Sequence, residues 1–362
     1  MSETVAVPEN LDALQTLLAS ESVVLPVGNQ TKLPLAVDEH ARLVSLRELS
    51  GILEYEPSEF TFTAYAGTPV AEVSEVLRER QQYLPFDPML VKAGATMGGS
   101  VAAGLSGPGR FRYGGLRDFL LGIKFLSGDG EVINAGGKVV KNAAGFDIPK
   151  FMAGSLGRFG VMVELTFKVF PLPSHRQTIA VQCSSLANAM QRMSDAATSR
   201  WELDAIDYRP GTNTVFLRVA GPLEVNQVLV QEISDLWGQD VKPMPDAEAF
   251  WQSVVELDWS DSDLSFAAKI PTHPVVLRSL VPWAEQTAGV DLHVSVAGSV
   301  AWALCESQHE VDQLDHLLAE NSTAGLVVRG DCRQPKIGFW AKQDIASAVK
   351  MAMDPTMKFP QL

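Results

Sequence analysis

A glycine-rich stretch at residues 93–171 constrains this chain more than any other feature. It holds more than half of the 28 glycines and separates them with short apolar runs that predict strands. Glycine has no Cβ, so it is favoured where the backbone turns sharply or closely approaches another group. The stretch therefore indicates backbone packed around something bulky, and a large phosphate-bearing cofactor is the natural candidate.

The spacing of these glycines does not match the two common phosphate-binding motifs. A Rossmann site needs G-x-G-x-x-G between a strand and a helix, and a phosphate loop needs G-x-x-x-x-G-K-[ST]. Neither occurs, since residues 154–160 read G-S-L-G-R-F-G and lead into an expected strand. Consecutive N–H groups of a turn can bind a diphosphate without a helix. From composition alone, such a nest and a purely structural role in turns and bulges are equally consistent with the glycines.

The first half of the chain predicts strands and helices around two glycine-rich turns, of which the first is the polar turn 28–32. Thr68 and Pro69 are expected as the N-cap and first residue of a helix, and Asp129-Gly130 predicts a hairpin. The strands of this half are expected at 22–26, 60–66, 121–126, 131–134 and 161–169.

The prolines Pro171 and Pro173 mark the first expected domain boundary. Two units of strands and helices follow, a pattern typical of an antiparallel sheet with helices on one face. Strands are expected at 203–208, 214–220, 291–297, 299–305 and 325–329, and helices at 222–237, 274–287, 307–320 and 342–353. The apolar face of the helix at 222–237 is expected to comprise Val225, Val228, Leu229, Ile233 and Leu236.

These patterns predict an α+β protein of three parts. We expect a cofactor-binding domain at 1–172, a smaller antiparallel α+β cap domain at 173–332, and a C-terminal segment at 333–362 that returns to the first domain.

Composition excludes several classes of function. The net charge of −14, from 29 basic and 43 acidic residues, argues against a nucleic-acid surface and a polybasic membrane-docking face. Cys183, Cys305 and Cys332 form no C-x-x-C pair, so a zinc site or iron–sulfur cluster has no ligand set. No apolar segment reaches the roughly 20 residues of a membrane-spanning helix, and no signal peptide is recognisable. We expect no nucleic-acid partner, no metal, no direct membrane insertion and a cytoplasmic location, with any approach to the inner membrane made through partners.

Seven motifs in order resemble the flavin-binding fold of the vanillyl-alcohol oxidase and p-cresol methylhydroxylase (PCMH-type) superfamily, over about residues 5–172. Within it the chain most resembles the FAD-binding E subunits of glycolate oxidases, whose ending is similar to V-K-M-A-M-D-P-T-M-K-F at 349–359. The motifs are V-L-P-V-G-N-Q-T-K at 24–32, L-P-F-D-P at 84–88, A-T-M-G-G-S-V-A-A at 95–103, R-Y-G-G-L-R-D at 112–118, G-D-G-E-V at 128–132, K-N-A-A-G-F-D at 141–147 and G-S-L-G-R-F-G-V at 154–161.

The resemblance implies a two-part PCMH-type FAD-binding domain and a set of residues that would hold FAD. The first turn would bind the diphosphate through its amides, although Asn29 and Gln30 stand where the family more often has glycine. The second loop, from Gly94 to Ser100, would lie close to the diphosphate and the ribityl chain. The third loop, which contains Gly157 and Gly160, would lie against the flavin. The implied residues are Pro26, Val27, Gly28, Asn29, Gln30, Thr31, Lys32, Pro85, Gly94, Ala95, Thr96, Gly98, Gly99, Ser100, Gly104, Arg112, Tyr113, Gly157, Gly160 and Val161.

Two of the motif residues also have a plain structural interpretation. Arg112 matches an element near the flavin ring, but a surface charge is an equal alternative, and Asp147 is expected to serve its own loop. Members that attach FAD covalently use a histidine in the first loop or a cysteine near the second. Neither position offers one here, so we predict non-covalent FAD.

The sequence does not identify catalytic residues. Oxidation of a 2-hydroxy acid at a flavin needs a base for the hydroxyl proton and a cation for the carboxylate. Larger dehydrogenases of the superfamily carry H-x-G-D-G-N-x-H in the cap, whereas residues 325–333 read G-L-V-V-R-G-D-C-R. Arg329 and Arg333 are candidates for anion binding, with a surface role as the alternative.

Three functions remain open. The resemblance favours the FAD-binding subunit of a glycolate oxidase complex that oxidises glycolate to glyoxylate, beside a larger FAD-containing subunit and an iron–sulfur subunit. The missing histidine motif points to electron relay or structural support rather than to the main oxidation of the substrate. The alternatives are a stand-alone FAD-dependent oxidoreductase for another 2-hydroxy acid or alcohol, and a scaffold with a vestigial flavin site.

Overall fold

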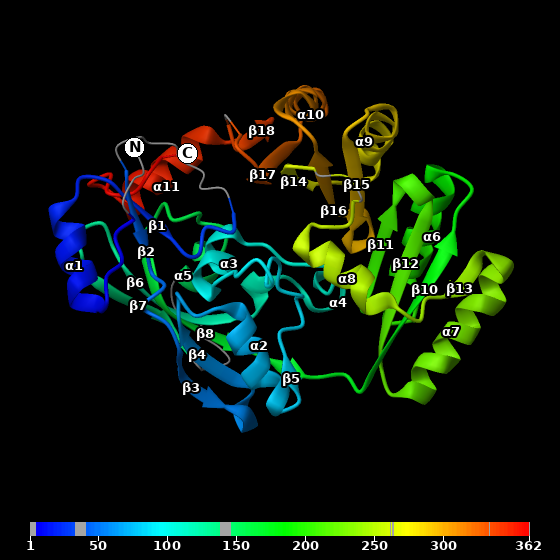
Figure 1. The fold of residues 1–362 in the computed structure, drawn as a ribbon, viewed down its shortest axis with the longest axis horizontal. Coiled ribbons are helices and arrows are strands. Elements are labelled where there is room, and N and C mark those ends of the chain that lie inside the picture. The colour runs from blue at the N-terminus through cyan, green and yellow to red at the C-terminus, as the bar shows by residue number, and fades with distance from the viewer. Residues whose placement is uncertain are drawn as a thin grey trace. The chain divides into compact units, whose positions relative to one another are not determined.

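A computed structural model describes residues 5–32, 41–137, 146–260, 262, 264–332 and 334–361. The chain divides into two compact units, shown in Figure 1. The first unit comprises Met1–Ser106, Gly115–Leu172 and Lys342–Leu362, and the second comprises Gly107–Gly114 and Pro173–Ala341. Both units combine helices with antiparallel sheets, so the predicted α+β architecture is confirmed.

The first unit is built on a five-stranded antiparallel sheet. Its order is β3 (Ile52–Glu56), β4 (Thr61–Tyr65), β8 (Val161–Lys168), β6 (Leu120–Leu126) and β7 (Val132–Gly136). Two small sheets accompany it: β1 (Val24–Val27) pairs in parallel with β2 (Arg42–Ser45), and β5 (Gln82–Tyr83) pairs with β9 (Phe170–Pro171).

Aromatic side chains fill the core beside the central strands β4 and β8. Phe62 and Phe167 are stacked with ring centroids 5.7 Å apart, and Phe86 lies 6.4 Å from Phe167. All three are at most 1% exposed. Alternate residues of a strand face the same side, which is why the alternation over 161–169 correctly predicted β8 and its buried face.

The helices of the first unit are α1 (Leu11–Ser20), α2 (Val70–Glu79), α3 (Met97–Ala103), α5 (Ile148–Met152) and α11 (Gln343–Met353). The predicted start of α2 is wrong in one detail, because Pro69 rather than Thr68 occupies the cap position. The Thr68 hydroxyl instead accepts from the Gly51 amide and donates to the Gly51 carbonyl. Thr68 therefore ties two loops together.

The second unit contains a nine-stranded antiparallel sheet in the order β13-β10-β12-β11-β15-β16-β14-β17-β18. Its strands are β10 (His175–Gln182), β11 (Ala205–Arg209), β12 (Thr214–Gly221), β13 (Val241–Pro243), β14 (Phe266–Pro271), β15 (Val290–Ser295), β16 (Val300–Cys305), β17 (Ala324–Arg329) and β18 (Lys336–Gly338). Its helices are α4 (Arg110–Tyr113), α6 (Leu186–Thr198), α7 (Leu223–Trp237), α8 (Ala247–Glu256), α9 (Pro274–Gln286) and α10 (Gln308–Glu320).

Short 3₁₀ turns connect several of these elements. They are η1 (Pro57–Glu59), η2 (Leu116–Asp118), η3 (Pro210–Thr212), η4 (Gly238–Asp240) and η5 (Val296–Gly298).

The second sheet consists of two β-α-β-β-α-β units of the same strand order. The first runs from β10 to β13 and the second from β14 to β17, and they join where β11 pairs with β15. In Figure 1, α8 lies on the opposite side of β11 and β12 from α6 and α7. There Phe250 and Trp251 of α8 pack with Ala205 and Phe216 of the sheet.

The predicted apolar face of α7 is wrong at three of its five residues and right at Ile233. Val225, Val228 and Leu236 are 52%, 66% and 64% exposed, whereas Ile233 and Trp237 are buried. The helix also buries Asn226, whose side-chain amide donates to the carbonyl of His175 at 3.2 Å. A hydrogen-bonded polar side chain can thus take the place of an apolar one and turn the helix about its axis.

Buried polar side chains of the second sheet bond to one another. The Asp207 carboxylate is fully buried and accepts from Ser295 Oγ at 2.8 Å, while His293 Nε2 lies 2.8 Å from its other oxygen. Asp204 pairs with Arg218, which is 4% exposed. Such buried groups need partners, and these clusters supply most of them, while Asp204 Oδ1 and His293 Nδ1 have none among the described residues.

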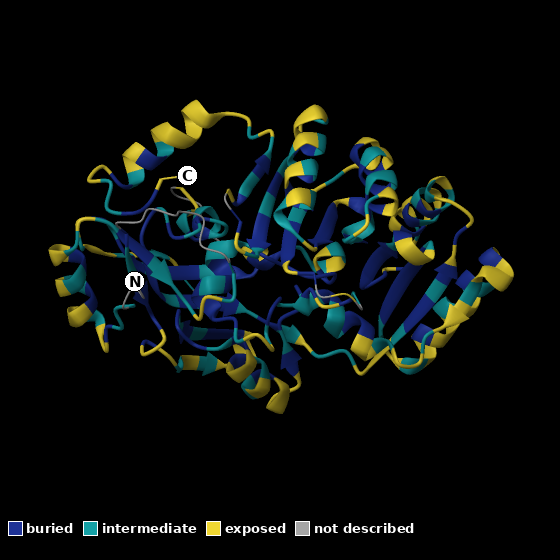
Figure 2. Cartoon of the chain, turned by 45° about the horizontal axis from the view of Figure 1, so that its top comes forward, coloured by how far each residue is buried: buried dark blue, intermediate teal, exposed yellow. Residues whose placement is uncertain are grey.

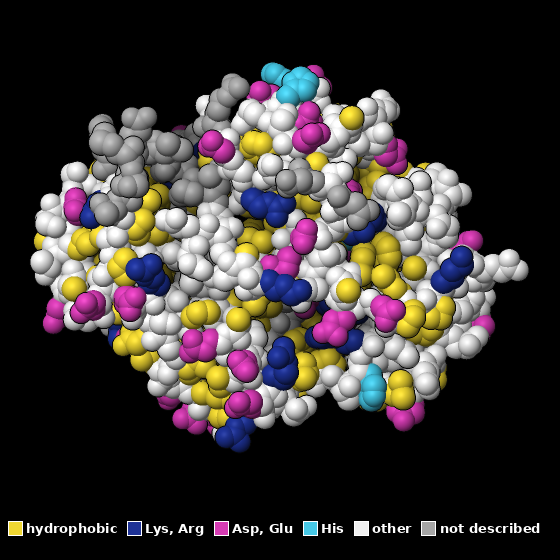
Figure 3. Space-filling view, viewed as in Figure 1, with side chains coloured by type: hydrophobic (Ala, Val, Ile, Leu, Met, Phe, Trp, Pro, Cys, Tyr) yellow, Lys and Arg dark blue, Asp and Glu magenta, His cyan; other side chains and the backbone are white. Residues whose placement is uncertain are grey.

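The surface is mixed in charge and the strands lie inside. Figure 2 shows the strands of both large sheets mostly buried and the helices exposed on their outer sides. On the face seen in Figure 3, lysines and arginines lie singly among aspartates and glutamates. None of the helices within the described ranges is both long and apolar enough to cross a membrane.

We predict that the three cysteines resist modification in the folded protein. All are free and buried, and burial raises the pKa of the Cys305 thiol to about 12 and also raises the pKa of Cys183 and Cys332. Only the thiolate reacts, so at pH 8 almost none of Cys305 is in the reactive form. The raised pKa of Cys183 and Cys332 also disfavours their thiolates. A thiol reagent such as DTNB should titrate three thiols in denaturant and react far more slowly with the native chain. Rapid reaction of native Cys305 at pH 8 would contradict its burial.

Candidate functional site

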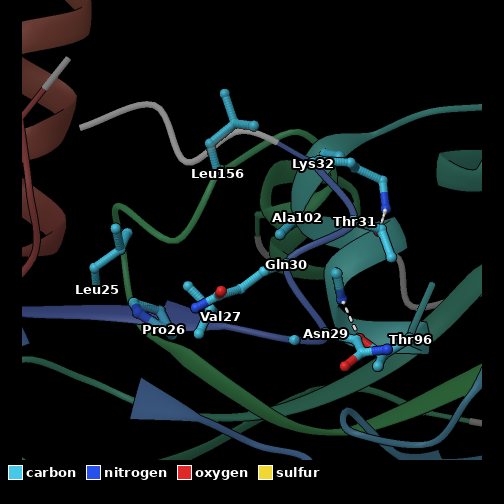
Figure 4. A pocket seen from close by; sticks show the side chains of 13 residues that line it. Leu25, Pro26, Val27, Asn29, Gln30, Thr31, Lys32, Thr96, Ala102 and Leu156 are labelled. Atoms are coloured by element: carbon cyan, nitrogen blue, oxygen red, sulfur yellow. Dashed lines mark hydrogen bonds between the residues drawn. The ribbon is translucent and has the colours of Figure 1, made fainter. Parts of the chain in front are cut away.

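A groove in the first unit brings together three segments that are far apart in the sequence. They are the end of β1 with the turn 28–32, the start of α3, and the loop 154–160. Figure 4 shows part of this groove, with Pro26 and Val27 on β1, Thr96 and Ala102 on α3, and Leu156 on the loop. The groove therefore joins the first glycine turn to two of the glycine loops in the stretch 93–171.

Gly28 and Thr96 make the closest approach in the groove. A Cβ on Gly28 would lie 2.3 Å from Thr96 Oγ1, which no real contact allows. The Thr96 hydroxyl is held in place, because it caps α3 by accepting from the Gly99 amide at 3.1 Å. Only glycine lets the turn lie this close to α3.

The turn 28–32 contains backbone N–H groups that no described acceptor uses. Gln30 adopts a left-handed conformation with φ 52°, one that glycine would adopt without strain. Within the described ranges, the amides of Asn29, Gln30 and Thr31 donate to no protein acceptor. Successive amides in such a turn form an anion-binding nest. Lys32, whose Nζ donates to Thr31 Oγ1 at 3.0 Å, adds positive charge at the same place.

The second glycine loop is bonded directly to the first turn. Asn29 Nδ2 donates to the carbonyl of Gly94 at 3.3 Å, and Gly94 has φ +91°, which favours glycine. The same loop is fixed to the body of the unit, since the Gly98 amide donates to the carbonyl of Ala66 at 2.7 Å. The turn and the loop therefore form one rigid wall.

The third loop completes the groove beside β1. A Cβ on Gly157 would press on Pro26 at 3.1 Å, and Gly157 also has φ +78°. The loop is tied to α3, because Gly154 and Leu156 donate their amides to the carbonyls of Val101 and Ala102 at 2.9 Å. Arg158 is partly buried in this loop, and burial lowers the pKa of its guanidinium to about 10. It still carries its charge at neutral pH.

Most of the residues that the family resemblance implies meet in this groove. The lining includes Pro26, Val27, Gly28, Asn29, Gln30, Thr31, Lys32, Thr96, Gly98, Gly99, Gly157 and Gly160. Outside the lining lie Pro85, Gly94, Ala95, Ser100, Gly104, Arg112, Tyr113 and Val161. Sequence reasoning missed the apolar lining, Leu25, Leu46, Ala66, Ala102, Ala103, Leu156 and Met162. Leu25, Ala102, Ala103 and Leu156 lie within the quoted motifs, whereas Leu46, Ala66 and Met162 lie outside them and resemble ordinary core positions.

Arg112 and Tyr113 belong to the second unit, in the helix α4. The Arg112 guanidinium pairs with Glu202, at 2.9 Å from the carboxylate. A role beside the flavin therefore stays a prediction for both. Asp147 caps α5 by accepting from the Lys150 amide at 3.2 Å, the local role that was expected of it.

Arg329 holds a loop of the second unit. Its guanidinium donates to the carbonyls of Leu257 and Leu264 at 3.0 and 3.2 Å, beside a hollow that also contains Asp258. Arg333 lies outside the described residues. Within the described ranges, no three side chains of histidine, cysteine, aspartate or glutamate gather as metal ligands would.

The chemistry of the groove fits FAD. Lys32 and the turn amides, which have no acceptor among the described residues, suit a diphosphate, and the absence of Cβ atoms at Gly28 and Gly99 makes room for it. Val27, Leu46 and Met162 offer apolar surface to a ring. The Ser100 hydroxyl is buried behind this wall and has no partner among the described residues. The described lining contains neither histidine nor cysteine.

Comparisons with known proteins agree with this groove. An FAD binding domain family matches residues 3–136. The glycolate oxidase subunit GlcE of Escherichia coli (strain K12) is 31% identical over 246 residues, which cover 68% of this chain and 67% of that protein. The chain belongs to this FAD-binding family of glycolate oxidase E subunits. Its relatives are FAD-dependent oxidoreductases, and FAD is its cofactor.

Two further comparisons extend the family and the fold. The glycolate oxidase subunit GlcD of Bacillus subtilis (strain 168) is 26% identical over 206 residues, covering 55% of this chain and 44% of that subunit. A solved alkyldihydroxyacetonephosphate synthase structure superimposes with a TM-score of 0.72 at 15% identity, covering 99% of this chain and 77% of the synthase. The PCMH-type fold predicted from the motifs is thereby confirmed.

We predict that Gly28→Ala weakens FAD binding. The new methyl group would collide with Thr96 Oγ1, and overpacking of this kind costs about 1–3 kcal/mol. If that cost falls on the FAD-bound form, the dissociation constant rises by about fivefold to 150-fold. Fluorescence titration of the apoprotein with FAD measures the change. Gly137→Ala is the matched control, since its Cβ would meet nothing within 4 Å. Equal affinities of the Gly28→Ala and Gly137→Ala chains would exclude the groove as the FAD site.

Proposed function

We propose that this chain is the FAD-binding subunit of a glycolate oxidase complex that converts glycolate to glyoxylate. The complex would also contain a larger FAD-containing subunit and an iron–sulfur subunit, and would reach a membrane only through those partners. The observation that carries the proposal is the groove around Gly28, in a chain that matches the GlcE subunit over two thirds of its length. The similarity to a GlcD subunit supports a multi-subunit enzyme.

The residues of the groove would bind and orient the cofactor. The amides of Asn29 to Thr31 and the Lys32 ammonium would hold the diphosphate, with Gly98 and Gly99 beside it. Gly157 and Gly160 would lie against the ring system. When it is bound, FAD accepts a hydride or electrons. The chain's own contribution is to fix the cofactor and shield it from water.

Electron relay or structural support is the role we propose, rather than the main oxidation of glycolate. Proton abstraction from a hydroxy acid needs a base, and the stretch 325–333 contains no histidine. Arg329, a candidate for binding the substrate carboxylate, donates to the carbonyls of Leu257 and Leu264. That bonding supports a structural role for its guanidinium.

Reconstitution tests the proposal. We expect the isolated chain to bind FAD but to show no glycolate-dependent dye reduction, and the complex with both partner subunits to turn over. A complex that contains the Gly28→Ala chain should be slower if electrons pass through this FAD. The larger flavin subunit alone serves as the control for background oxidation.

Three outcomes would replace the proposal. Turnover of glycolate by the isolated chain would make it the oxidising subunit. Turnover of another 2-hydroxy acid or an alcohol without any partner would make it a stand-alone oxidoreductase. A purified chain that binds no flavin would leave only a scaffold.

We also predict that FAD leaves the chain intact on denaturation. No histidine or cysteine of the described lining is placed to bond to it covalently. After heat or acid denaturation and ultrafiltration, the flavin absorbance should appear in the filtrate with the mass of free FAD. Colour that stays with the precipitated protein would contradict a non-covalent site.

A further inference from the structure

The helix α11 carries a buried lysine. Most of its residues are exposed, yet Lys350 is only 6% exposed. A lysine is rarely buried unless its charge is paired, because removing the ammonium from water is costly. Burial lowers the pKa of Lys350, although its bond to Asp354 acts against that change. The position of this charge therefore needs an explanation.

All three donor positions of the Lys350 ammonium are used. Nζ pairs with the Asp354 carboxylate and donates to the carbonyls of Phe359 at 2.8 Å and Arg158 at 2.7 Å. Asp354 is fully buried and in turn accepts from the amides of Lys358 at 3.0 Å and Phe359 at 2.8 Å. An ammonium has three N–H groups, so the buried pair is fully satisfied.

One of these three bonds reaches outside the C-terminal segment. The Arg158 carbonyl belongs to the loop 154–160, which contributes Gly157 and Gly160 to the groove. The early part of the loop is bonded to α3 through the amides of Gly154 and Leu156. The bond from Lys350 falls after Gly157 and before Gly160, between the two glycines that line the groove.

We propose that Lys350 is a positioning residue for the cofactor: it holds the loop 154–160 in the shape that admits FAD, from a site 192 residues away in the chain. Gly157 and Gly160 both have positive φ values, +78° and +155°, so the path of the loop depends on its backbone geometry as well as on the packing of the buried Phe159 side chain. A donor fixed by a buried carboxylate supplies that geometry. The proposal rests on the placement of FAD in this groove.

The test compares Lys350→Met with Lys358→Met. Lys358 has the same chemistry in the same tail, but its Nζ donates to the carbonyls of Leu18 and Glu21 beside α1. Both variants are expected to lower the melting temperature. We expect only Lys350→Met to raise the FAD dissociation constant, by about tenfold, the effect of losing one hydrogen bond to a charged donor. Fluorescence titration of the apoproteins gives both constants.

Hydrogen exchange provides a reading that does not depend on FAD. In the apoprotein, amides of 154–160 should exchange faster in Lys350→Met than in the wild type or Lys358→Met. Their unchanged exchange together with an unchanged dissociation constant would overturn the proposal. A wild-type chain that does not bind FAD, or that binds it equally after Gly28→Ala, would instead overturn the placement of the cofactor.

A second variant decides the case if Lys350→Met fails to fold. Lys350→Met with Asp354→Asn removes both buried charges while keeping a side-chain acceptor at residue 354, so an unpaired carboxylate no longer destabilises the chain. If Lys350 positions the loop, this folded double variant still binds FAD about tenfold more weakly than Lys358→Met does. Wild-type affinity in the double variant would show that the lysine contributes stability alone.

Discussion

The approach of Gly28 to Thr96 is the contact on which the groove depends. A Cβ on Gly28 would lie only 2.3 Å from Thr96 Oγ1, so no other residue fits there. The threonine cannot move away easily, because its hydroxyl caps α3. The turn 28–32 and the start of α3 therefore form one surface, strengthened by the bond from Asn29 to Gly94. The amides of residues 29–31, which have no acceptor among the described residues, belong to that surface and are suited to bind a diphosphate.

The C-terminal segment fixes the third side of the same groove. Lys350 and Asp354 form a buried pair whose hydrogen bonds extend to the Arg158 carbonyl, while Lys358 holds the end of α1 and its carbonyl accepts from Val24 at the start of β1. The last residues of the chain thus contact both the first strand and the third glycine loop. Of the tail side chains, the Lys350 ammonium bonds to that loop, whereas the Lys358 ammonium bonds to carbonyls beside α1.

In the second unit, the periodicity of apolar residues was not sufficient to predict which helix faces are buried. Residues 225, 228 and 236 have a helical spacing that matched an apolar face, yet α7 buries Asn226, Ile233 and Trp237. Contacts with other parts of the unit determine which face of α7 is buried. Asn226 bonds to the carbonyls of His175 and Gly221, and the ring of Trp237 packs against that of Trp201. The helix α8 went unrecognised in a polar stretch because its buried face, Phe250, Trp251 and Val254, is short.

The sequence by itself determined the glycine turns and the strands with clear alternation, such as β4 and β8, because these follow from local spacing. The resemblance of its short motifs to a known family implied FAD and most residues of the groove. Gln30 shows the limit of such motifs, because it adopts at φ 52° the conformation expected of glycine. Only the tertiary structure decided the apolar lining, the pairing of Arg112 with Glu202 and the reach of Lys350 to Arg158. These contacts join residues whose separation in the chain carries no periodic signal, so packing alone could select them.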